Sequence, residues 1–428
     1  MPEVSNSPVK RPDEPVILLT DTSRYATPAR MAIALAAAGA RIDAVCPPRD
    51  HCLRKTRAVH KLYSHSWYEP LDALESAIQA SNPALVIPCD DRGVQDLHEL
   101  YCRALQLAPA KKSLTDLIER SLGPAASFPT VLSRHDFLKL AREENLRVPA
   151  TQLVASLADL DAWSSAHPFP WVLKADGTCG GRGVRIVHTR AEAERAFHEI
   201  SRPPRVTGAM RRLILDRDAF WLRPWWKGAA PAVIVQAFVS GTPANCAAVC
   251  WQGEALSGLG VEVVSAQDST GPATVVRVVE NSEMSLAAVR IASRLKLSGF
   301  IGLDFMIEEK TGVTYLIEMN PRCTPLCHLQ LGPGRDMVAS IFAKLSATPP
   351  REAAPATGNT LIAYFPRAWT FNKDLLPSCF QDIPQNEPDL VEELLHPQRN
   401  RRFIQRRLSR RRSKKTGTTH ANQPRPAA

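Results

Sequence analysis

The sequence predicts an α/β protein in which a parallel sheet is followed by a longer region rich in strands. Over roughly residues 15–110, short apolar runs alternate with helical patterns, an order typical of a doubly wound parallel sheet. Further strand patterns recur as far as Glu318. Hydrophobic residues make up 44% of the chain and charged residues 22%, which fits a folded globular protein and excludes general disorder.

The first elements follow from local signals. A helix is expected from Thr27, with Thr27 as its N-cap, Pro28 at its first position and Gly39 just past its end. A second helical stretch covers about 70–80. Three apolar runs are expected to form strands around these helices: Val16–Thr20, Ile42–Cys46 and Ala84–Pro88. No G-x-G-x-x-G motif follows the first strand, so a dinucleotide site there is not expected.

The remaining elements are expected in a different order. A helical pattern begins near Ser133, and a strand at Trp171–Lys174 runs into a glycine-rich turn. Residues 201–231 contain several Arg, Pro and Trp residues and resemble an insertion. Another helix is expected at Ser285–Leu295. The other strand patterns are Val184–His188, Ala232–Val239, Ala244–Cys250, Glu254–Leu259, Thr274–Val279, Phe300–Ile307 and Val313–Glu318.

The net charge of +10 comes from the C-terminal tail. Residues 399–415 contain ten basic residues and no acidic one, and Arg425 adds another. The rest of the chain has 42 basic and 43 acidic side chains, so its charge is close to zero. The tail is interpreted either as a basic amphipathic segment for an anionic membrane or another polyanion, or as a disordered solubilising tail. No apolar run approaches 18 residues and no secretory signal is visible, so a cytoplasmic location is expected.

The most informative segment is Ile301–Arg322, which predicts two antiparallel strands joined by a Lys-Thr-Gly turn. Glu318 and Asn320 share one face of the second strand by the period-two rule, and Asp304 can lie opposite them. Three oxygen ligands, two of them anionic, suit Mg²⁺ held together with substrate phosphates. Arg322 would direct a guanidinium at the same place, where it could hold a phosphate or a carboxylate.

Two weaker signals precede this hairpin. Lys174 ends a buried strand and is followed by a loop containing Gly180, Gly181 and Gly183, which can surround phosphate oxygens with backbone N–H groups. Glycine-rich turns are also common for purely steric reasons. The run Val233–Val239 is an apolar strand that ends near Gly241 and could offer backbone groups to an adenine edge, although an ordinary core strand is the more common explanation of such a run.

Together, these segments resemble the ATP-grasp superfamily, in particular its carbamoyl-phosphate-synthase-like branch, over roughly residues 110–345. The resemblance implies an α+β, two-lobed ATP-grasp module after the parallel α/β unit. It implies that Lys174 contacts nucleotide phosphates, and that Arg322 steadies the transferred phosphoryl group or the acyl-phosphate. It implies adenine binding by the hinge strand, and a cation site for Mg²⁺, or Mn²⁺ as an alternative. The hinge residues are Gln236, Ala237 and Val239, and the metal ligands are Asp304, Glu318 and Asn320.

The chain departs from the family pattern at several positions. The first phosphate-contacting lysine of the family falls in register with Arg134, which keeps the charge and changes the geometry. Gln236 stands where the hinge strand of the family usually has an acidic residue. A second acidic residue often follows the position of Gly241 in the family, and this chain has Pro243 and Asn245 there. Gly302 replaces an arginine of D-alanine–D-alanine ligases, which argues against that branch.

The expected organisation is a polar lead (1–14), a pre-ATP-grasp α/β domain (15–110), an ATP-grasp module (111–346, lid about 150–240), a linker with a C-terminal extension (347–398) and the basic tail (399–428). The expected function is an ATP- and Mg²⁺-dependent carboxylate–amine ligase that works through an acyl-phosphate. The alternatives are a catalytically degenerate nucleotide-binding regulator or scaffold, and a polyanion-binding protein acting through the tail. Candidate partners are the carboxylate and amine substrates, a polyanion at 399–415 and a second copy of the chain.

Overall fold

The computed structural model describes residues 14–23, 25–49, 51–107, 110–178, 181, 183–202, 230–268, 270–350 and 354–396. The residues expected to form most of the polar lead, the Trp-containing segment at 221–226 and the basic tail lie outside these ranges, as does Gly180. In the described part of the chain, no helix is both long and apolar enough to cross a bilayer. The domain boundaries expected from the sequence stay a prediction.

The N-terminal unit is a four-stranded parallel sheet in the order β3-β2-β1-β4. The three apolar strands expected from the sequence are present. The fourth, β3, lies at the sheet edge with most of its residues exposed, which hides it from a search for apolar runs. The strands are β1 (Val16–Thr20), β2 (Arg41–Cys46), β3 (Val59–Ser64) and β4 (Leu85–Pro88).

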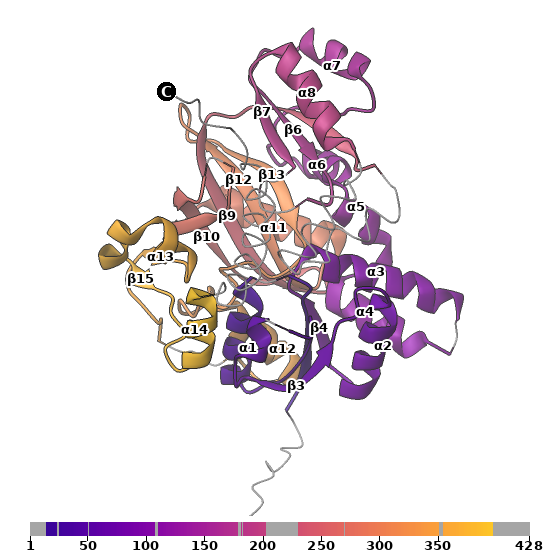
Figure 1. Ribbon diagram of the computed structural model, residues 1–428, viewed down its shortest axis with the longest axis vertical. Coiled ribbons are helices and arrows are strands. Elements are labelled where there is room, and N and C mark those ends of the chain that lie inside the picture. The colour runs from indigo at the N-terminus through magenta and orange to yellow at the C-terminus, as the bar shows by residue number, and fades with distance from the viewer. Residues whose placement is uncertain are drawn as a thin grey trace, which may run out of the picture.

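Helices connect and cover this sheet (Figure 1). The expected helix at Thr27 is confirmed, but its N-cap is Ala26 without a side-chain hydrogen bond, so the prediction of a Thr27 cap is wrong by one residue. Asp90 caps the N-terminus of α3 by accepting from Gly93 N. The elements are α1 (Thr27–Ala38), η1 (Cys52–Arg54), α2 (Pro70–Ser81), α3 (Asp91–Gln106), α4 (Lys112–Leu122), η2 (Ala125–Ser127), α5 (Phe128–Leu132) and α6 (Arg134–Glu143).

A small antiparallel sheet forms the upper lobe in Figure 1, with two helices on its outer face. Its strand order is β5-β8-β6-β7, so the candidate hinge strand β8 lies beside β6, which carries Lys174. The elements are β5 (Thr151–Leu153), α7 (Leu157–Ser164), β6 (Trp171–Ala175), β7 (Val184–Val187), α8 (Arg190–Ile200) and β8 (Val233–Ala237).

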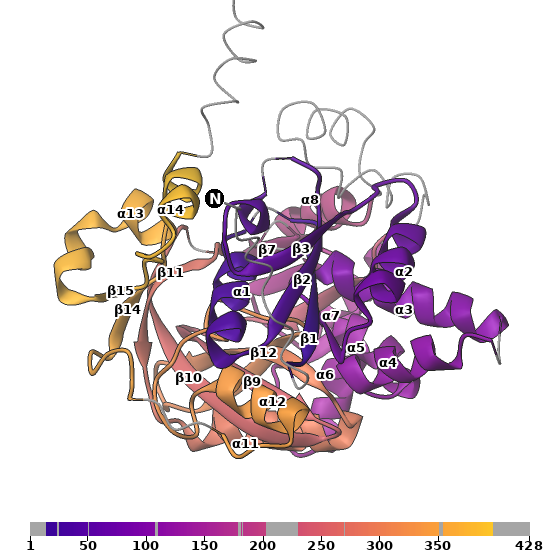
Figure 2. The same ribbon diagram turned by 90° about the horizontal axis from the view of Figure 1, so that it is seen from below.

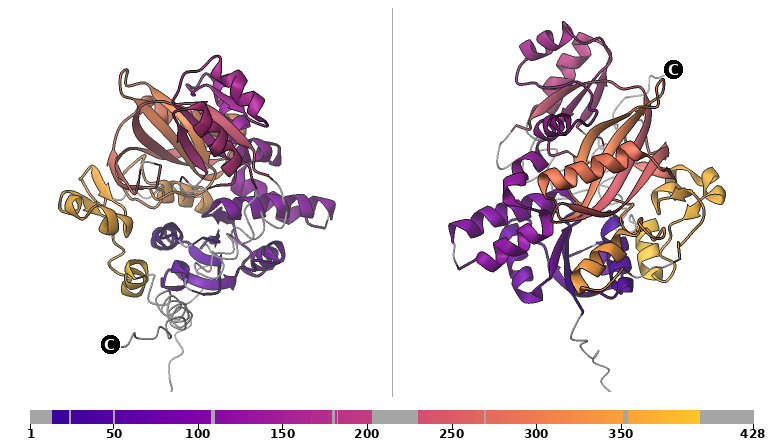
Figure 3. Two further views of the ribbon diagram at one scale, coloured as in Figure 1. Left: turned by 45° about the horizontal axis from the view of Figure 1, so that its top comes forward. Right: turned by 180° about the vertical axis from the view of Figure 1, so that it is seen from behind.

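A seven-stranded sheet in the order β13-β12-β9-β10-β11-β14-β15 forms the centre of the molecule. Helix α11 lies across one face (Figure 3), and α12 packs between β9 and α1 (Figure 2). The elements are β9 (Gly241–Trp251), β10 (Glu254–Ala266), β11 (Ala273–Val278), α11 (Ser282–Leu295), β12 (Gly299–Glu308), β13 (Thr314–Asn320), α12 (Met337–Ser346), β14 (Leu361–Ala363) and β15 (Phe380–Gln381).

The C-terminal extension adds β14 and β15 to the edge of this sheet and then returns to the N-terminal unit. It also contains α13 (Arg367–Phe371), η3 (Lys373–Ser378) and α14 (Pro388–Leu395). Asp382 is buried and forms an ion pair with Arg30 of α1, and it also contacts His328 Nε2 at 2.8 Å. Glu387 accepts a hydrogen bond from Thr56 Oγ1 at 2.9 Å. Apolar residues of the first sheet, the central sheet and this extension also pack into one continuous core.

Candidate functional site

A cavity of about 420 Å³ lies between the small antiparallel sheet and the central sheet, and residues of the N-terminal unit and the C-terminal extension close its base. Among the residues expected to form the site, Gly183 is described but does not line the cavity. Those that line it are Arg134, Lys174, Gly181, Gln236, Ala237, Val239, Asp304, Glu318, Asn320 and Arg322. The structure thus brings together residues that are up to 188 positions apart, the separation of Arg134 and Arg322.

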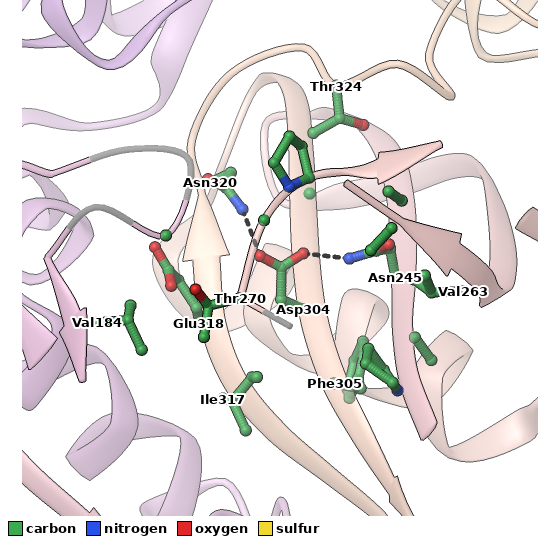
Figure 4. A pocket seen from close by; sticks show the side chains of 18 of the residues that line it. Val184, Asn245, Val263, Thr270, Asp304, Phe305, Ile317, Glu318, Asn320 and Thr324 are labelled. Carbon is green, nitrogen blue, oxygen red and sulfur yellow. Dashed lines mark hydrogen bonds between the residues drawn. The ribbon is translucent and has the colours of Figure 1, made fainter. Parts of the chain in front are cut away.

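The acidic hairpin has the register expected from the sequence. Asp304 on β12 lies directly opposite Glu318 on β13, and Gly302 lies opposite Asn320. Asp304 accepts hydrogen bonds from Asn320 Nδ2 at 3.0 Å and from Asn245 Nδ2 at 2.5 Å (Figure 4). Burial and the neighbouring charge of Glu318 raise the pKa of Asp304 to about 6. Two carboxylates held this close repel each other, and a bound cation would relieve that repulsion.

The donor set fits Mg²⁺ held jointly with a nucleotide. Asp304, Glu318 and Asn320 offer oxygen atoms from neighbouring positions of one hairpin, and Mg²⁺ prefers one or two carboxylates together with phosphate oxygens and water. In the described ranges, no group of three or more His, Cys, Asp or Glu residues is arranged as a metal site. A cation here would therefore depend on the phosphates of a nucleotide for its remaining ligands.

Arg134, the first residue of α6, reaches into this site. Its Nη2 donates to Glu318 Oε1 at 2.6 Å, and its Nη1 donates to the backbone oxygen of Ala175 at 2.7 Å. Asp176 lies 3.2 Å from the same Nη1. Burial opposes the charge of Arg134, but the nearby carboxylates of Glu318 and Asp176 raise its pKa above the ordinary value. The position chosen by register therefore lines the cavity, where several hydrogen bonds hold its side chain.

Lys174 is in the opposite situation. The side chain is only 5% exposed, and its ammonium group forms no hydrogen bond or ion pair with any residue that the structure describes. Burial lowers the pKa of Lys174 to about 8, and Arg134 adds to this effect, while Glu318 and Asp304 oppose it. A buried cation without a partner, at the wall of a cavity, is suited to receive an anion.

Gly181, in the glycine-rich segment after β6, lines the cavity. Gly181 has a φ of +75°, and a Cβ atom there would lie 2.2 Å from the backbone oxygen of Thr270. Only glycine satisfies both requirements. Gly181 therefore lies close to Thr270 of the β10–β11 connection at the wall of the cavity.

The candidate hinge strand is fixed in its sheet and ends at the cavity. Gln236 is buried and donates from Nε2 to Thr151 Oγ1 at 3.1 Å. β8 ends at Ala237, and Phe238 and Val239 follow it along the cavity wall. This geometry leaves the chain just past the strand in a position to meet a flat apolar ring.

The site also contains residues that the sequence analysis did not select. Asp91, at the start of α3, lies 2.8 Å from Arg322 Nε, and Arg322 also donates to Asn320 Oδ1 at 3.1 Å. Burial opposes the charge of Arg322, but Asp91 raises its pKa above the ordinary value. Tyr25, Tyr364 and Arg367 line the cavity beside this pair. We call Tyr25, Asp91, Arg322, Tyr364 and Arg367 the arginine cluster.

Comparison with known proteins agrees with this geometry. A family model described as an ATP-grasp domain matches residues 136–325. The carbamoyl phosphate synthase large chains of two Thermus thermophilus strains are 27% identical to this chain over 191 residues. The match covers 44% of this chain and 17% of each relative, so the chain corresponds to less than a fifth of their length.

Solved structures show the same fold at low sequence identity. An N5-carboxyaminoimidazole ribonucleotide synthetase from Thermus thermophilus has a TM-score of 0.55 at 15% identity, over 79% of this chain and 80% of that one. A biotin carboxylase from Campylobacter jejuni has a TM-score of 0.55 at 13% identity, over 81% of this chain and 73% of that one. An L-amino acid ligase from Bacillus licheniformis has a TM-score of 0.51 at 13% identity, over 80% of this chain and 76% of that one.

The fold similarity and the matched domain agree with each other. Residues 136–325 match the ATP-grasp domain, and the fold of the chain is similar to that of N5-carboxyaminoimidazole ribonucleotide synthetase and biotin carboxylase.

Proposed function

We propose that this protein is an ATP- and Mg²⁺-dependent carboxylate–amine ligase that forms ADP and phosphate through an acyl-phosphate intermediate. The observation that carries the proposal is the meeting of Lys174, Arg134 and the facing acids Asp304 and Glu318 in one cavity, next to Arg322. This is the arrangement that phosphoryl transfer needs, because such catalysis depends mainly on positioning and charge neutralisation.

Each group has a distinct task in this proposal. Lys174 binds phosphate oxygens, and the turn after β8 receives the adenine ring. Asp304, Glu318 and Asn320 hold the cation, which supplies charge neutralisation at the phosphates. Arg322 is kept in place by Asp91 and Asn320, and it holds the carboxylate in line with the terminal phosphate and stabilises the acyl-phosphate that forms.

One observation favours a second candidate, a nucleotide-binding protein without turnover. Arg134 forms an ion pair with Glu318 and so occupies one oxygen of a proposed metal ligand. If this ion pair persists when nucleotide binds, the cation has one acid fewer. ATP would then bind without being consumed, as expected of a regulator or scaffold.

Product analysis separates these functions. The purified protein is incubated with MgATP and a panel of amino acids and small carboxylic acids, and nucleotides are separated by chromatography. The ligase predicts ADP and phosphate that depend on a carboxylate and an amine. AMP as the only product would refute the acyl-phosphate route, and ATP binding without release of ADP under any combination would support the regulator.

A matched pair of variants tests the hairpin itself. Glu318→Gln removes one proposed metal ligand, whereas Glu309→Gln removes an exposed acid at the turn of the same hairpin, outside the cavity. The first variant should lose at least about 100-fold in ADP release, and the second should retain wild-type activity. Equal activity of the two variants would contradict the assignment of Glu318.

A further inference from the structure

The arginine cluster contains two guanidinium groups and only one carboxylate. Asp91 pairs with Arg322 at 2.8 Å. Arg367 forms no hydrogen bond or ion pair with any residue in the described part of the chain, and its contact there is with the ring of Tyr25, 5.3 Å from the guanidinium carbon. One positive charge at the cavity wall is therefore left without an anion.

The backbone around Arg367 is fixed, so this position is not an accident of a loose loop. β14 pairs with β11, and Tyr364 N donates to the backbone oxygen of Thr274 at 2.9 Å. Ala368 N then donates to the oxygen of Tyr364 at 3.0 Å as α13 begins. Burial lowers the pKa of Arg367 and the charge of Arg322 adds to this, while Tyr25 and Tyr364 oppose it. An arginine nevertheless stays charged at neutral pH.

We propose that Arg367 binds a carboxylate of the amine substrate, so that the second substrate is an amino acid or another amine that carries a carboxylate. This inference rests on the proposed ligase function. Arg322 lies next to the metal hairpin through its hydrogen bond to Asn320, where the carboxylate that is phosphorylated must lie. Arg367 is the first residue of α13, which follows β14, and it is free to hold the other carboxylate.

Charge and geometry favour a carboxylate over a phosphate group. A guanidinium and a carboxylate form two parallel hydrogen bonds and neutralise each other. A phosphate group carries close to two negative charges, and the only other arginine of the cluster is already neutralised by Asp91. The ring of Tyr25 forms an apolar wall beside the guanidinium of Arg367. Such a wall suits the side chain of an amino acid whose carboxylate pairs with Arg367.

The first experiment compares each amino acid of the panel with its C-terminal amide in the ADP-release assay. The amino acid should have a kcat/KM at least about 10-fold above that of the amide, because the amide cannot pair with a guanidinium. Arg367→Gln should raise the KM for the amino acid about 10- to 100-fold, the loss typical of a charged hydrogen bond, and leave the KM for MgATP within about twofold. Arg367→Lys should recover part of the loss.

Arg277→Gln is the matched control. Arg277 lies on β11 next to β14, is half exposed and does not line the cavity. This variant should behave as wild type in every assay. The inference fails if amides and amino acids are used equally well, or if only amines bearing a phosphate are used. It also fails if Arg367→Gln raises the KM for MgATP as much as the KM for the amino acid.

A binding measurement keeps this inference separable from the ligase function. Sodium succinate is titrated calorimetrically into protein saturated with MgADP, for wild type, Arg367→Gln and Arg277→Gln. Succinate affinity that falls at least about 10-fold only in Arg367→Gln supports the carboxylate site even if no ADP is released from ATP. Succinate affinity that does not depend on Arg367 overturns it, even if the protein proves to be a ligase.

Discussion

The two ends of the cavity handle charge differently. At the end that holds the acidic hairpin, where we propose that the nucleotide binds, Arg134 is bound to Glu318 and Asp176. Lys174 faces Glu318 and Asp304 there without a direct partner among the described residues. Positive and negative side chains are close to balanced there, and a cation bound with the nucleotide would offset part of the negative charge of its phosphates. In the arginine cluster, Asp91 compensates only one of two arginines. This difference supports the two anion sites that we propose, one suited to phosphates with a metal and one without a metal.

The largest effect is expected at Lys174, where function and stability should change in opposite directions. Lys174→Met removes the cation that meets the phosphates, and kcat/KM for MgATP should fall about 100- to 1000-fold. The same change should raise the free energy of unfolding of the nucleotide-free protein by about 1–3 kcal/mol at pH 7, because a buried ammonium without a partner is costly. Urea denaturation and steady-state kinetics measure both effects.

The stability gain in Lys174→Met should depend on pH in a defined direction. The folded-state pKa of about 8 lies below the ordinary value of 10.5, so the wild-type lysine is destabilising at low pH and the penalty declines as pH rises from 8 to 10.5. The difference between variant and wild type should therefore be largest below pH 8. A constant difference across this range would show that the ammonium is not desolvated.

The next largest effect is expected at Asp91. Asp91→Asn leaves Arg322 without its carboxylate, which should lower the free energy of unfolding by about 1–3 kcal/mol and ADP release by about 10-fold. Asp116→Asn, an exposed acid on α4 outside the cavity, is the control. If Asp91→Asn leaves both quantities unchanged, the pair does not position Arg322.

Affinity for MgATP should also respond to pH through Lys174. Because nucleotide binding requires the charged ammonium, the affinity should be constant below pH 8 and should decline above it by up to about 10-fold per pH unit. Lys174→Arg should remove this dependence, since arginine stays charged. Calorimetric titrations between pH 7 and pH 9.5 distinguish the two curves, and parallel curves would contradict the role of Lys174.

The smallest effect is expected from the basic tail, which contributes no residue that we place at either end. A protein ending at Pro397 should retain ADP-release activity within about twofold and lose any salt-sensitive binding to anionic vesicles or nucleic acid. Loss of turnover in the folded, truncated protein would mean that the tail takes part in catalysis.

The grouping of the acidic-hairpin residues at the cavity could be predicted from the sequence because these residues are concentrated in a short segment. Asp304, Glu318, Asn320 and Arg322 lie within 19 residues on one hairpin, and strand periodicity is enough to put the acids opposite each other. Most strands were also predicted from local sequence, because the central ones are continuous apolar runs. β3 was missed because most of its residues are exposed and it forms no continuous apolar run.

The arginine cluster could not be predicted in this way. Tyr25, Asp91 and Arg367 come from three segments separated by up to 342 positions, and each looks ordinary in its local sequence. Arg367 opens a five-residue helix after a Pro/Ala-rich stretch, which carries no periodic signal. Only the pairing of β14 with β11, together with the packing of α1 against the extension, brings these residues to one cavity.

The contacts of Asp382 and Glu387 with the N-terminal unit have a consequence for synthesis of the chain on the ribosome. Their partners Arg30 and Thr56 are made 352 and 331 residues earlier, an interval of roughly 20–70 s at the usual elongation rate of about 5–20 residues per second. During that time part of the α1 surface is uncovered, and the arginine cluster is incomplete. A nascent chain should therefore bind MgATP before it binds an amino acid, a sequence of events that stalled ribosome–nascent-chain complexes of increasing length can measure.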